Sequence, residues 1–239
     1  MAASSKEPAV SDQALGSDAR GFSFALQESA GRLELRALHR PDYGSIRADW
    51  SSTEQHRRIS AGRKQLLARA TGLQKHPAPL LLDATAGLGR DGFTLAWLGA
   101  RVTMLERHPQ IAALLQDAHR RALADPRLAA VAAGIEVRTG DAASLMARQP
   151  WDVIYLDPMY PHSNKSALPQ KEMQIFRDLT GGDPDADALL SPALAAARRR
   201  VVVKRPARAP WLAGRSPSLS FEGSQARFDV YLIHGTQDG

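Results

Sequence analysis

Short apolar runs alternate with helix-forming segments along the last two thirds of the chain. The pattern predicts strands at 80–84, 102–106, 135–138, 153–156 and 201–204. It predicts helices at 91–98, from 109 onward, at 170–180 and at 185–199. This alternation is typical of an α/β fold with a doubly wound, mostly parallel sheet, which binds ligands at the carboxyl ends of its strands. Apolar segments at 219–221 and 228–233 predict an antiparallel C-terminal hairpin.

The N-terminal third has a different pattern. Short apolar segments predict strands at 22–26, 33–38 and 46–48, separated by turns that contain glycine or proline. Ser51-Ser-Thr-Glu54 has the spacing of a capping box and predicts a helix that ends near Gly72. We therefore expect a flexible leader over residues 1–20, a small N-terminal β/α appendage over 21–76 and a larger domain over 77–239.

Composition narrows the class of protein. Of the 239 residues, 44% are hydrophobic, which is enough for one substantial core. Cysteine is absent, which excludes disulfides and thiolate metal sites, and the histidines lack metal-binding spacing, so we predict no metal. No apolar run approaches the roughly 20 residues that span a bilayer, and the N-terminus does not resemble a signal peptide. We expect a cytoplasmic protein without a membrane partner.

Positive charge is unevenly distributed in a chain whose net charge is +6. Between Asp187 and Glu222 the charged residues are all basic: Arg198, Arg199, Arg200, Lys204, Arg205, Arg208 and Arg215. A second basic cluster contains Arg36, Arg40, Arg47, Arg57, Arg58, Arg63, Lys64 and Arg69. Such clusters can neutralise nucleic-acid phosphates, but they also occur on solvated faces. Charge alone therefore leaves nucleic-acid binding open.

A glycine turn follows the first strand of the larger domain. Gly87-Leu-Gly-Arg-Asp-Gly92 matches the spacing G-x-G-x-x-G, and Glu106 stands at the end of the next expected strand. Gly87 and Gly89 allow the backbone to turn tightly beside a ligand, and the Glu106 carboxylate can accept hydrogen bonds from ribose hydroxyls. The turn predicts a nucleoside-cofactor site, and an NAD(P)- or FAD-dependent oxidoreductase is one interpretation.

Three carboxylates near this turn favour a cationic cofactor. Asp91 stands at a helix start, where it would repel a pyrophosphate but attract the sulfonium and ammonium groups of S-adenosyl-L-methionine. Asp83 can hold the ammonium group or order the turn. Asp141 follows the third expected strand, where it can accept a hydrogen bond from an adenine amino group. Together they predict an acidic cradle for a methyl donor, with helix capping by Asp91 and Asp141 as the alternative.

Asp157-Pro-Met-Tyr-Pro161 follows the fourth expected strand. Amino groups on bases are weak nucleophiles, and acceptors for both N–H bonds would favour a pyramidal nitrogen aimed at the methyl carbon. The Asp157 carboxylate and the Pro158 carbonyl are such acceptors, and Tyr160 can stack on the base. These three are the candidate catalytic residues, and alignment with an activated sulfonium would supply most of the rate gain. A proline-rich turn with a packed tyrosine is the structural alternative.

The combined motifs resemble those of class I S-adenosylmethionine-dependent methyltransferases, which have a Rossmann-like fold. Asp157-Pro-Met-Tyr160 is similar to the Asp/Asn-Pro-Pro-Tyr/Phe signature of amino-group methyltransferases, with Met159 replacing the second proline. The stretches 83–91, 105–109 and 155–162 resemble the RsmJ family more narrowly, and this resemblance covers most of residues 33–233. It implies cofactor contacts from Arg90, Asp91, Glu106, Arg107, Asp141, Ala142 and Asp157.

The RsmJ resemblance also implies a reaction and a partner. The reaction is methylation of the exocyclic N2 of a guanine in small-subunit (16S) ribosomal RNA, with S-adenosyl-L-homocysteine as a product, and the partner is ribosomal RNA or the small ribosomal subunit. The residues alone leave open adenine N6, cytosine N4 and a non-catalytic RNA-binding protein. His162, Asn164 and Lys165 either line the base pocket or form a surface loop. Lys204 either contacts phosphate or is paired within the protein.

Overall fold

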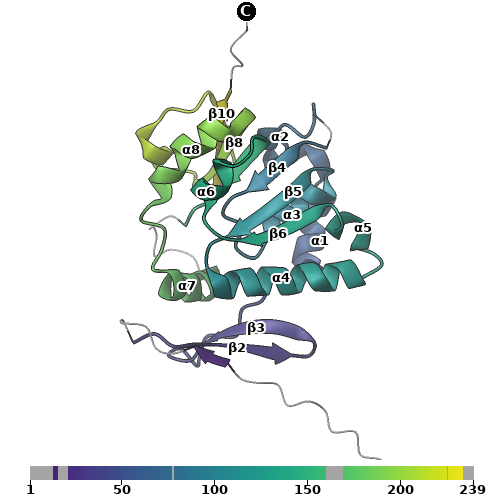
Figure 1. Cartoon of the computed structure of the whole chain (residues 1–239), viewed down its shortest axis with the longest axis vertical. Helices are drawn as coiled ribbons and strands as arrows, with labels where there is room; N and C mark the ends of the chain where they lie inside the picture. Colours follow the sequence, from purple (N-terminus) through teal and green to yellow (C-terminus); the bar gives the residue numbers. More distant parts are fainter. Residues whose placement is uncertain (1–12, 16–20, 77, 160–168, 225, 234–239) are drawn as a thin grey trace, which may run out of the picture.

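A seven-stranded sheet forms the centre of the protein (Figure 1). The computed structural model describes residues 13–15, 21–76, 78–159, 169–224 and 226–233. The strand order is β6-β5-β4-β7-β8-β10-β9. The strands are β4 (Leu80–Asp83), β5 (Arg101–Glu106), β6 (Ile135–Thr139), β7 (Trp151–Leu156), β8 (Ala197–Pro206), β9 (Leu219–Glu222) and β10 (Ala226–Leu232). Strands β6 to β8 in this order are parallel, and β10 is antiparallel to β8 and β9. The expected doubly wound sheet and C-terminal hairpin are confirmed.

Helices cover both faces of this sheet. They are α3 (Arg90–Trp97), α4 (Pro109–Ala124), α5 (Ala129–Ala132), α6 (Ala142–Met146), α7 (Pro169–Thr180) and α8 (Leu190–Ala196). Successive strand residues point to opposite faces, so Leu81 packs in one apolar cluster with Phe93 of α3, and Leu82 in another with Leu190 of α8. Burial on both faces explains the continuous apolar runs. In the described part of the chain, no helix is long and apolar enough to cross a bilayer.

The order of the strands places a crevice at the centre of the sheet. β5 and β6 extend the sheet on one side of β4, whereas β7 and β8 extend it on the other. Where crossovers diverge in this way, a ligand site forms beyond the carboxyl ends of the strands. Strands β4 and β7 end at Asp83 and Leu156, directly beside the two predicted motifs.

A smaller antiparallel sheet precedes the large one. Its strands are β1 (Gln13–Leu15), β2 (Phe24–Ser29) and β3 (Arg32–Ala37), and β3 contacts α4 (Figure 1). The strands expected at 22–26 and 33–38 are confirmed with shifted ends. The strand expected at 46–48 is wrong, because Ile46 makes an isolated bridge to Leu35. The chain turns soon afterwards, where the Asp49 carboxylate accepts the Ser51 N–H at 3.1 Å.

The single helix expected from Ser51 to Gly72 is broken into shorter pieces. These are α1 (Thr53–Ser60), the 3-10 turn η1 (Gly62–Lys64) and α2 (Leu66–Thr71). Ser52 caps α1 by accepting the Gln55 N–H at 3.2 Å. The break occurs at Gly62, whose φ of +61° lies in the left-handed region and ends the helix.

The helix expected at 185–199 also ends early. The 3-10 turn η2 (Ala186–Leu189) and α8 occupy its first part, but Ala197 already begins β8. In the extended conformation Arg200 pairs with Leu232 of β10, and its side chain reaches the Ala70 carbonyl at 3.1 Å. This tertiary pairing overrides the helical pattern of the alanine-rich sequence.

The hydrophobic core crosses the boundary expected at residue 76. Leu35 of β3, Trp50 and Leu67 of α2 belong to the same buried cluster as Leu81 and Phe93. The division into an appendage and a larger domain therefore stays a prediction.

Candidate functional site

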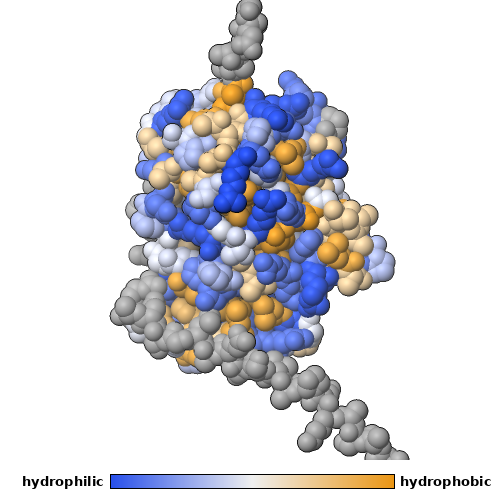
Figure 2. Space-filling view, viewed as in Figure 1, coloured by the Kyte–Doolittle hydropathy of each residue, from blue (hydrophilic) through white to orange (hydrophobic). Residues whose placement is uncertain are grey.

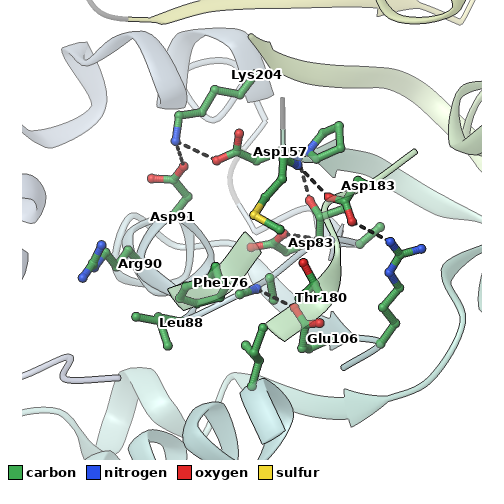
Figure 3. A pocket seen from close by; sticks show the side chains of 18 of the residues that line it. Asp83, Leu88, Arg90, Asp91, Glu106, Asp157, Phe176, Thr180, Asp183 and Lys204 are labelled. Carbon is green, nitrogen blue, oxygen red and sulfur yellow. Dashed lines mark hydrogen bonds and ion pairs between the residues drawn. The ribbon is translucent and has the colours of Figure 1, made fainter. Parts of the chain in front are cut away.

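A cavity of about 690 Å³ opens at the carboxyl ends of β4, β5, β7 and β8 (Figure 3). This volume is typical of a small-molecule site. The predicted residues in its wall are Asp83, Gly87, Arg90, Asp91, Glu106, Arg107, Asp141, Ala142, Asp157 and Pro158. Gly89 is not part of this wall. Tyr160, His162, Asn164 and Lys165 lie outside the described residues.

The glycine turn holds Glu106 in a fixed orientation. One Glu106 oxygen accepts the Gly87 N–H at 3.0 Å, and the other accepts the His108 N–H at 2.8 Å. Burial raises the pKa of Glu106, and these two backbone hydrogen bonds partly offset that effect. A carboxylate has about four acceptor positions, so Glu106 retains capacity for hydroxyl groups of a ligand. The geometry supports its predicted role toward a ribose.

Gly89 contributes to packing instead of to the cavity wall. Its φ is +74°, and an added Cβ would lie 2.5 Å from Leu115 and 2.9 Å from Trp50. Trp50 also donates its indole N–H to the Leu88 carbonyl at 3.0 Å. The second glycine of the motif therefore lets the start of α3 approach the core, and its assignment to the cofactor gains no support from the cavity. Gly87, by contrast, has open space where a Cβ would stand.

Asp91 is neutralised by neighbours that the sequence did not connect to it. Its carboxylate contacts Arg58 of α1 at 2.5 Å, Lys204 of β8 at 2.8 Å and the Tyr155 hydroxyl at 2.7 Å. Burial opposes ionisation, but the two cations hold the pKa of Asp91 well below its usual range. The cap of α3 is Gly89, without a side-chain hydrogen bond, so Asp91 does not serve as the N-cap.

The three carboxylates of the expected acidic cradle line the cavity, but positive side chains accompany them, so the cradle stays a prediction. Asp83 is 1% exposed, and burial together with Asp91 and Asp157 raises its pKa well above the usual value, which favours the protonated form. The remaining pair, Asp91 and Asp157, faces Lys204 and Arg58. The network is close to neutral, because several buried negative charges are stable together only when positive side chains accompany them.

Asp157 is held at the end of β7 by contacts to both its backbone and its side chain. Its N–H donates to the Thr85 hydroxyl at 2.6 Å, and its Oδ2 accepts from Lys204 at 2.8 Å. Burial raises the pKa of Asp157, Lys204 lowers it, and Asp91 raises it. Oδ1 takes no hydrogen bond from the described residues, and the residue lines the cavity. Asp157 is therefore placed to accept a hydrogen bond from a ligand, and Lys204 is a paired lysine.

Two predicted arginines connect the cavity wall to the segment around α7. Arg90 pairs with Glu172 of α7 at 2.9 Å. Arg107 pairs with Asp183 at 2.6 Å and with Asp185 at 2.8 Å. These ion pairs join the start of α3 and the end of β5 to α7 and to the loop that follows it.

Asp141 caps α6 and also lines the cavity. Its carboxylate accepts the Ser144 N–H at 2.8 Å, and hydrogen bonding from Ser144 lowers the pKa of Asp141. The capping alternative is thus realised, and the cavity position leaves a ligand contact compatible with it. Ala142 follows as the first residue of α6.

Several residues of the site were not predicted from the sequence to belong to it. Arg58 and Tyr43 come from the N-terminal third, whereas Asp183 follows α7 and Phe176 lies on it. Only the fold brings these segments to one cavity. Tyr155 belongs to the stretch 155–162 that resembles the RsmJ family, but its contact with Asp91 follows from the direction of β7.

The basic clusters are partly used within the protein. Arg200 donates to the Ala70 carbonyl, Arg205 to the Pro210 carbonyl, and Arg63 to the Leu98 carbonyl. On the face shown in Figure 2, hydrophilic side chains lie between apolar ones and do not form one continuous patch. Part of the positive charge in these clusters is therefore engaged in contacts within the protein.

A nucleoside-type methyl donor fits the residues present. The anchored Glu106 carboxylate, the open space at Gly87 and the apolar side chains of Leu88 and Ile111 line one cavity. Asp157 opens on the same cavity. No group of three or more metal-ligating side chains occurs within the described ranges.

Comparison with known proteins agrees with this site. A family model described as "Putative SAM-dependent methyltransferase" matches residues 11–233. The chain is 49% identical over 216 residues to the Ribosomal RNA small subunit methyltransferase J of Aeromonas hydrophila, covering 88% of this chain and 87% of the relative. It is 47% identical over 215 residues to the protein of the same name from Pseudomonas aeruginosa, covering 87% and 82%.

A solved structure shows the same fold. The crystal structure of a SAM-dependent methyltransferase from Neisseria gonorrhoeae matches with a TM-score of 0.70 and 36% identity, over 89% of this chain and 84% of that chain. These matches set aside the NAD(P)- or FAD-dependent oxidoreductase that the glycine spacing had left open. The cavity at the strand ends, its anchored Glu106 and its family match lead to one conclusion: the chain belongs to the family of S-adenosylmethionine-dependent methyltransferases.

Proposed function

We propose that this enzyme transfers a methyl group from S-adenosylmethionine to the exocyclic N2 of a guanine in small-subunit (16S) ribosomal RNA. One observation carries the proposal: the Asp157-Pro158 strand end opens on the same cavity as the glycine turn and Glu106. The names of the relatives from Aeromonas hydrophila and Pseudomonas aeruginosa support ribosomal RNA of the small subunit as the substrate. The guanine N2 rests on the RsmJ resemblance.

The residues around Asp157 are suited to activating an amino group. The cofactor supplies a methyl group on a positively charged sulfur, so the protein needs no strong base before transfer. Asp157 and the Pro158 carbonyl accept the two N–H bonds of the amine, which directs the nitrogen lone pair toward the donor. Burial raises the pKa of Asp157, and Lys204 opposes this rise and so favours the ionised, accepting form. Alignment of this kind accounts for a large part of enzymatic rate enhancement.

The predicted contacts divide the cavity by function. In this proposal Glu106 binds the ribose hydroxyls, Asp141 and Ala142 border the adenine, and Asp83, Arg90 and Asp91 border the amino-acid end of the cofactor. Arg107 supports the Glu106 end through its ion pairs. The substrate would place the enzyme in the cytoplasm, with the small ribosomal subunit or its RNA as partner.

Mass mapping of ribosomal RNA nucleosides tests the proposal. Cells that lack the protein should lack one N2-methylguanosine in 16S RNA, and the purified enzyme should restore it on isolated RNA or on small subunits. Asp157→Ala should abolish the transfer and leave RNA affinity within about threefold, since it removes one acceptor only. Appearance of a methyl group on adenine N6 or cytosine N4 would correct the base. An unchanged nucleoside map would contradict the proposed function.

A further inference from the structure

Asp183 contacts both sides of the site (Figure 3). Its Oδ1 lies 2.6 Å from a guanidinium nitrogen of Arg107, next to Glu106. Its Oδ2 accepts the backbone N–H of Met159, also at 2.6 Å, just beyond Asp157 and Pro158. The Asp183 side chain is 18% exposed, so solvent screens these contacts only in part.

The Met159 amide determines the direction of the Pro158 carbonyl. The two groups belong to one planar trans peptide, so the N–H and the C=O point in opposite directions. The Asp157 N–H donates to the Thr85 hydroxyl at 2.6 Å. Because Pro158 has no N–H, the next backbone donor along the chain is the Met159 amide. Holding both amides leaves the Pro158 carbonyl little freedom to rotate.

The loop that carries Asp183 is itself constrained. Gly181 and Gly182 have φ values of +74° and +82°, a conformation that side chains disfavour. The Gly181 N–H donates to the Arg177 carbonyl at 2.8 Å, and the Gly182 N–H donates to the Thr180 hydroxyl at 3.1 Å. The end of α7 therefore presents Asp183 from a defined turn.

We propose that Asp183 is a positioning residue. Its contact with the Met159 amide directs the Pro158 carbonyl toward the acceptor amine, and its contact with Arg107 couples that orientation to the part of the cavity beside Glu106. The inference rests on the proposed function and deepens it. Asp185 provides a natural contrast, because its two oxygens lie 2.8 and 2.9 Å from Arg107, and it makes no hydrogen bond to Met159. Its side chain is 57% exposed.

Three variants separate the two contacts of Asp183. Asp183→Ala should lower kcat about 10- to 100-fold, as expected when a reacting group is misplaced by about 1 Å. Asp183→Asn should recover most of that loss, because its amide oxygen can still accept the Met159 N–H. Asp185→Ala should lower kcat less than about threefold, since exposed ion pairs contribute little. Calorimetry with S-adenosylhomocysteine should show similar, small affinity changes in Asp183→Ala and Asp185→Ala, because each loses one partner of Arg107.

Amide exchange of the cofactor-free protein gives a readout independent of activity. NMR-detected hydrogen exchange of the Met159 amide should accelerate at least about tenfold in Asp183→Ala, and remain at the wild-type rate in Asp185→Ala and Asp183→Asn. Thermal unfolding checks that each variant is folded, and if Asp183→Ala is not, Asp183→Glu replaces it, because its longer side chain misplaces the acceptor.

Three results would overturn the inference: unchanged exchange at Met159, equal kcat losses in the Asp183 and Asp185 variants, or a loss confined to S-adenosylhomocysteine affinity. A wild-type enzyme that methylates no ribosomal RNA would instead contradict the proposed function. The exchange result stands apart from that failure, because it needs no substrate.

Discussion

At the scale of single residues, Lys204 is the cation that faces both Asp91 and Asp157. It lies 2.8 Å from each. Burial raises the pKa of Asp157, and Lys204 counteracts this rise. In Lys204→Met the pKa of Asp157 should increase further, so the carboxyl is protonated over a wider pH range. The acid limb of the pH–rate profile should move to higher pH, with about a tenfold fall in kcat for each unit by which the pKa exceeds the assay pH.

The measurement is kcat over roughly pH 5.5 to 9, at saturating cofactor and RNA. Lys204→Arg keeps a cation beside both carboxylates and serves as the matched control, with a profile close to wild type. If the profile of Lys204→Met coincides with that of the wild-type enzyme, Lys204 does not maintain the ionised form of Asp157.

The acidic residues of this network could be predicted, but their partners could not. Asp83 and Asp157 stand at strand ends, so their place at one edge of the sheet follows from the β/α alternation alone. Arg58 is far from both in the sequence and reaches Asp91 only because α1 packs against α3. The neutrality of the cluster is thus a property of tertiary contacts.

At the scale of elements, the two glycines of the turn have different roles: Gly87 lines the cavity, and Gly89 allows close packing against Leu115 and Trp50. Gly87→Ala adds a methyl group into open space at a φ of +54°, so its stability cost should be about 1–2 kcal/mol. Gly89→Ala forces a Cβ against Leu115 and Trp50, and should cost about 2–4 kcal/mol. Urea unfolding measures both costs.

Binding of S-adenosylhomocysteine should rank the two variants in the opposite order. Gly87 lines the cavity, so Gly87→Ala should weaken binding more than Gly89→Ala does under conditions where both are folded. Each variant is the control for the other, since the chemical change is identical. Equal stability losses, or stronger loss of binding in Gly89→Ala, would show that the turn is not divided in this way.

The elements themselves were predictable where apolar burial determines them. The buried strands β4, β5 and β7 stand out as apolar runs because helices cover both faces of the sheet. The helices expected at 51–72 and 185–199 were too long for different reasons. The first helix ends early because Gly62 has a left-handed backbone conformation. The second ends early because Arg200 pairs with β10 as part of strand β8.

At the scale of the whole molecule, two pairs of basic residues lie at different places relative to the cavity. Lys171 and Arg40 lie about the ring of Tyr43, at 5.2 and 5.3 Å from its centroid, and Tyr43 lines the cavity. Arg101 and Arg198 are exposed near the starts of β5 and β8, at the opposite end of the parallel strands. Net charge counts all four equally, but we expect an RNA strand whose base enters the cavity to contact only the first pair.

RNA binding should therefore distinguish two double variants that remove the same charge. Arg40→Ala/Lys171→Ala should weaken binding of 16S RNA and reduce the magnitude of the slope of log K against log salt by about 1 to 2. Each side-chain contact with a phosphate that is lost lowers this magnitude by about 0.7 to 0.9. Arg101→Ala/Arg198→Ala should leave the slope at its wild-type value. Fluorescence anisotropy across a salt series measures both. Equal changes in the two would mean that net charge, and not the cavity edge, governs the encounter with RNA.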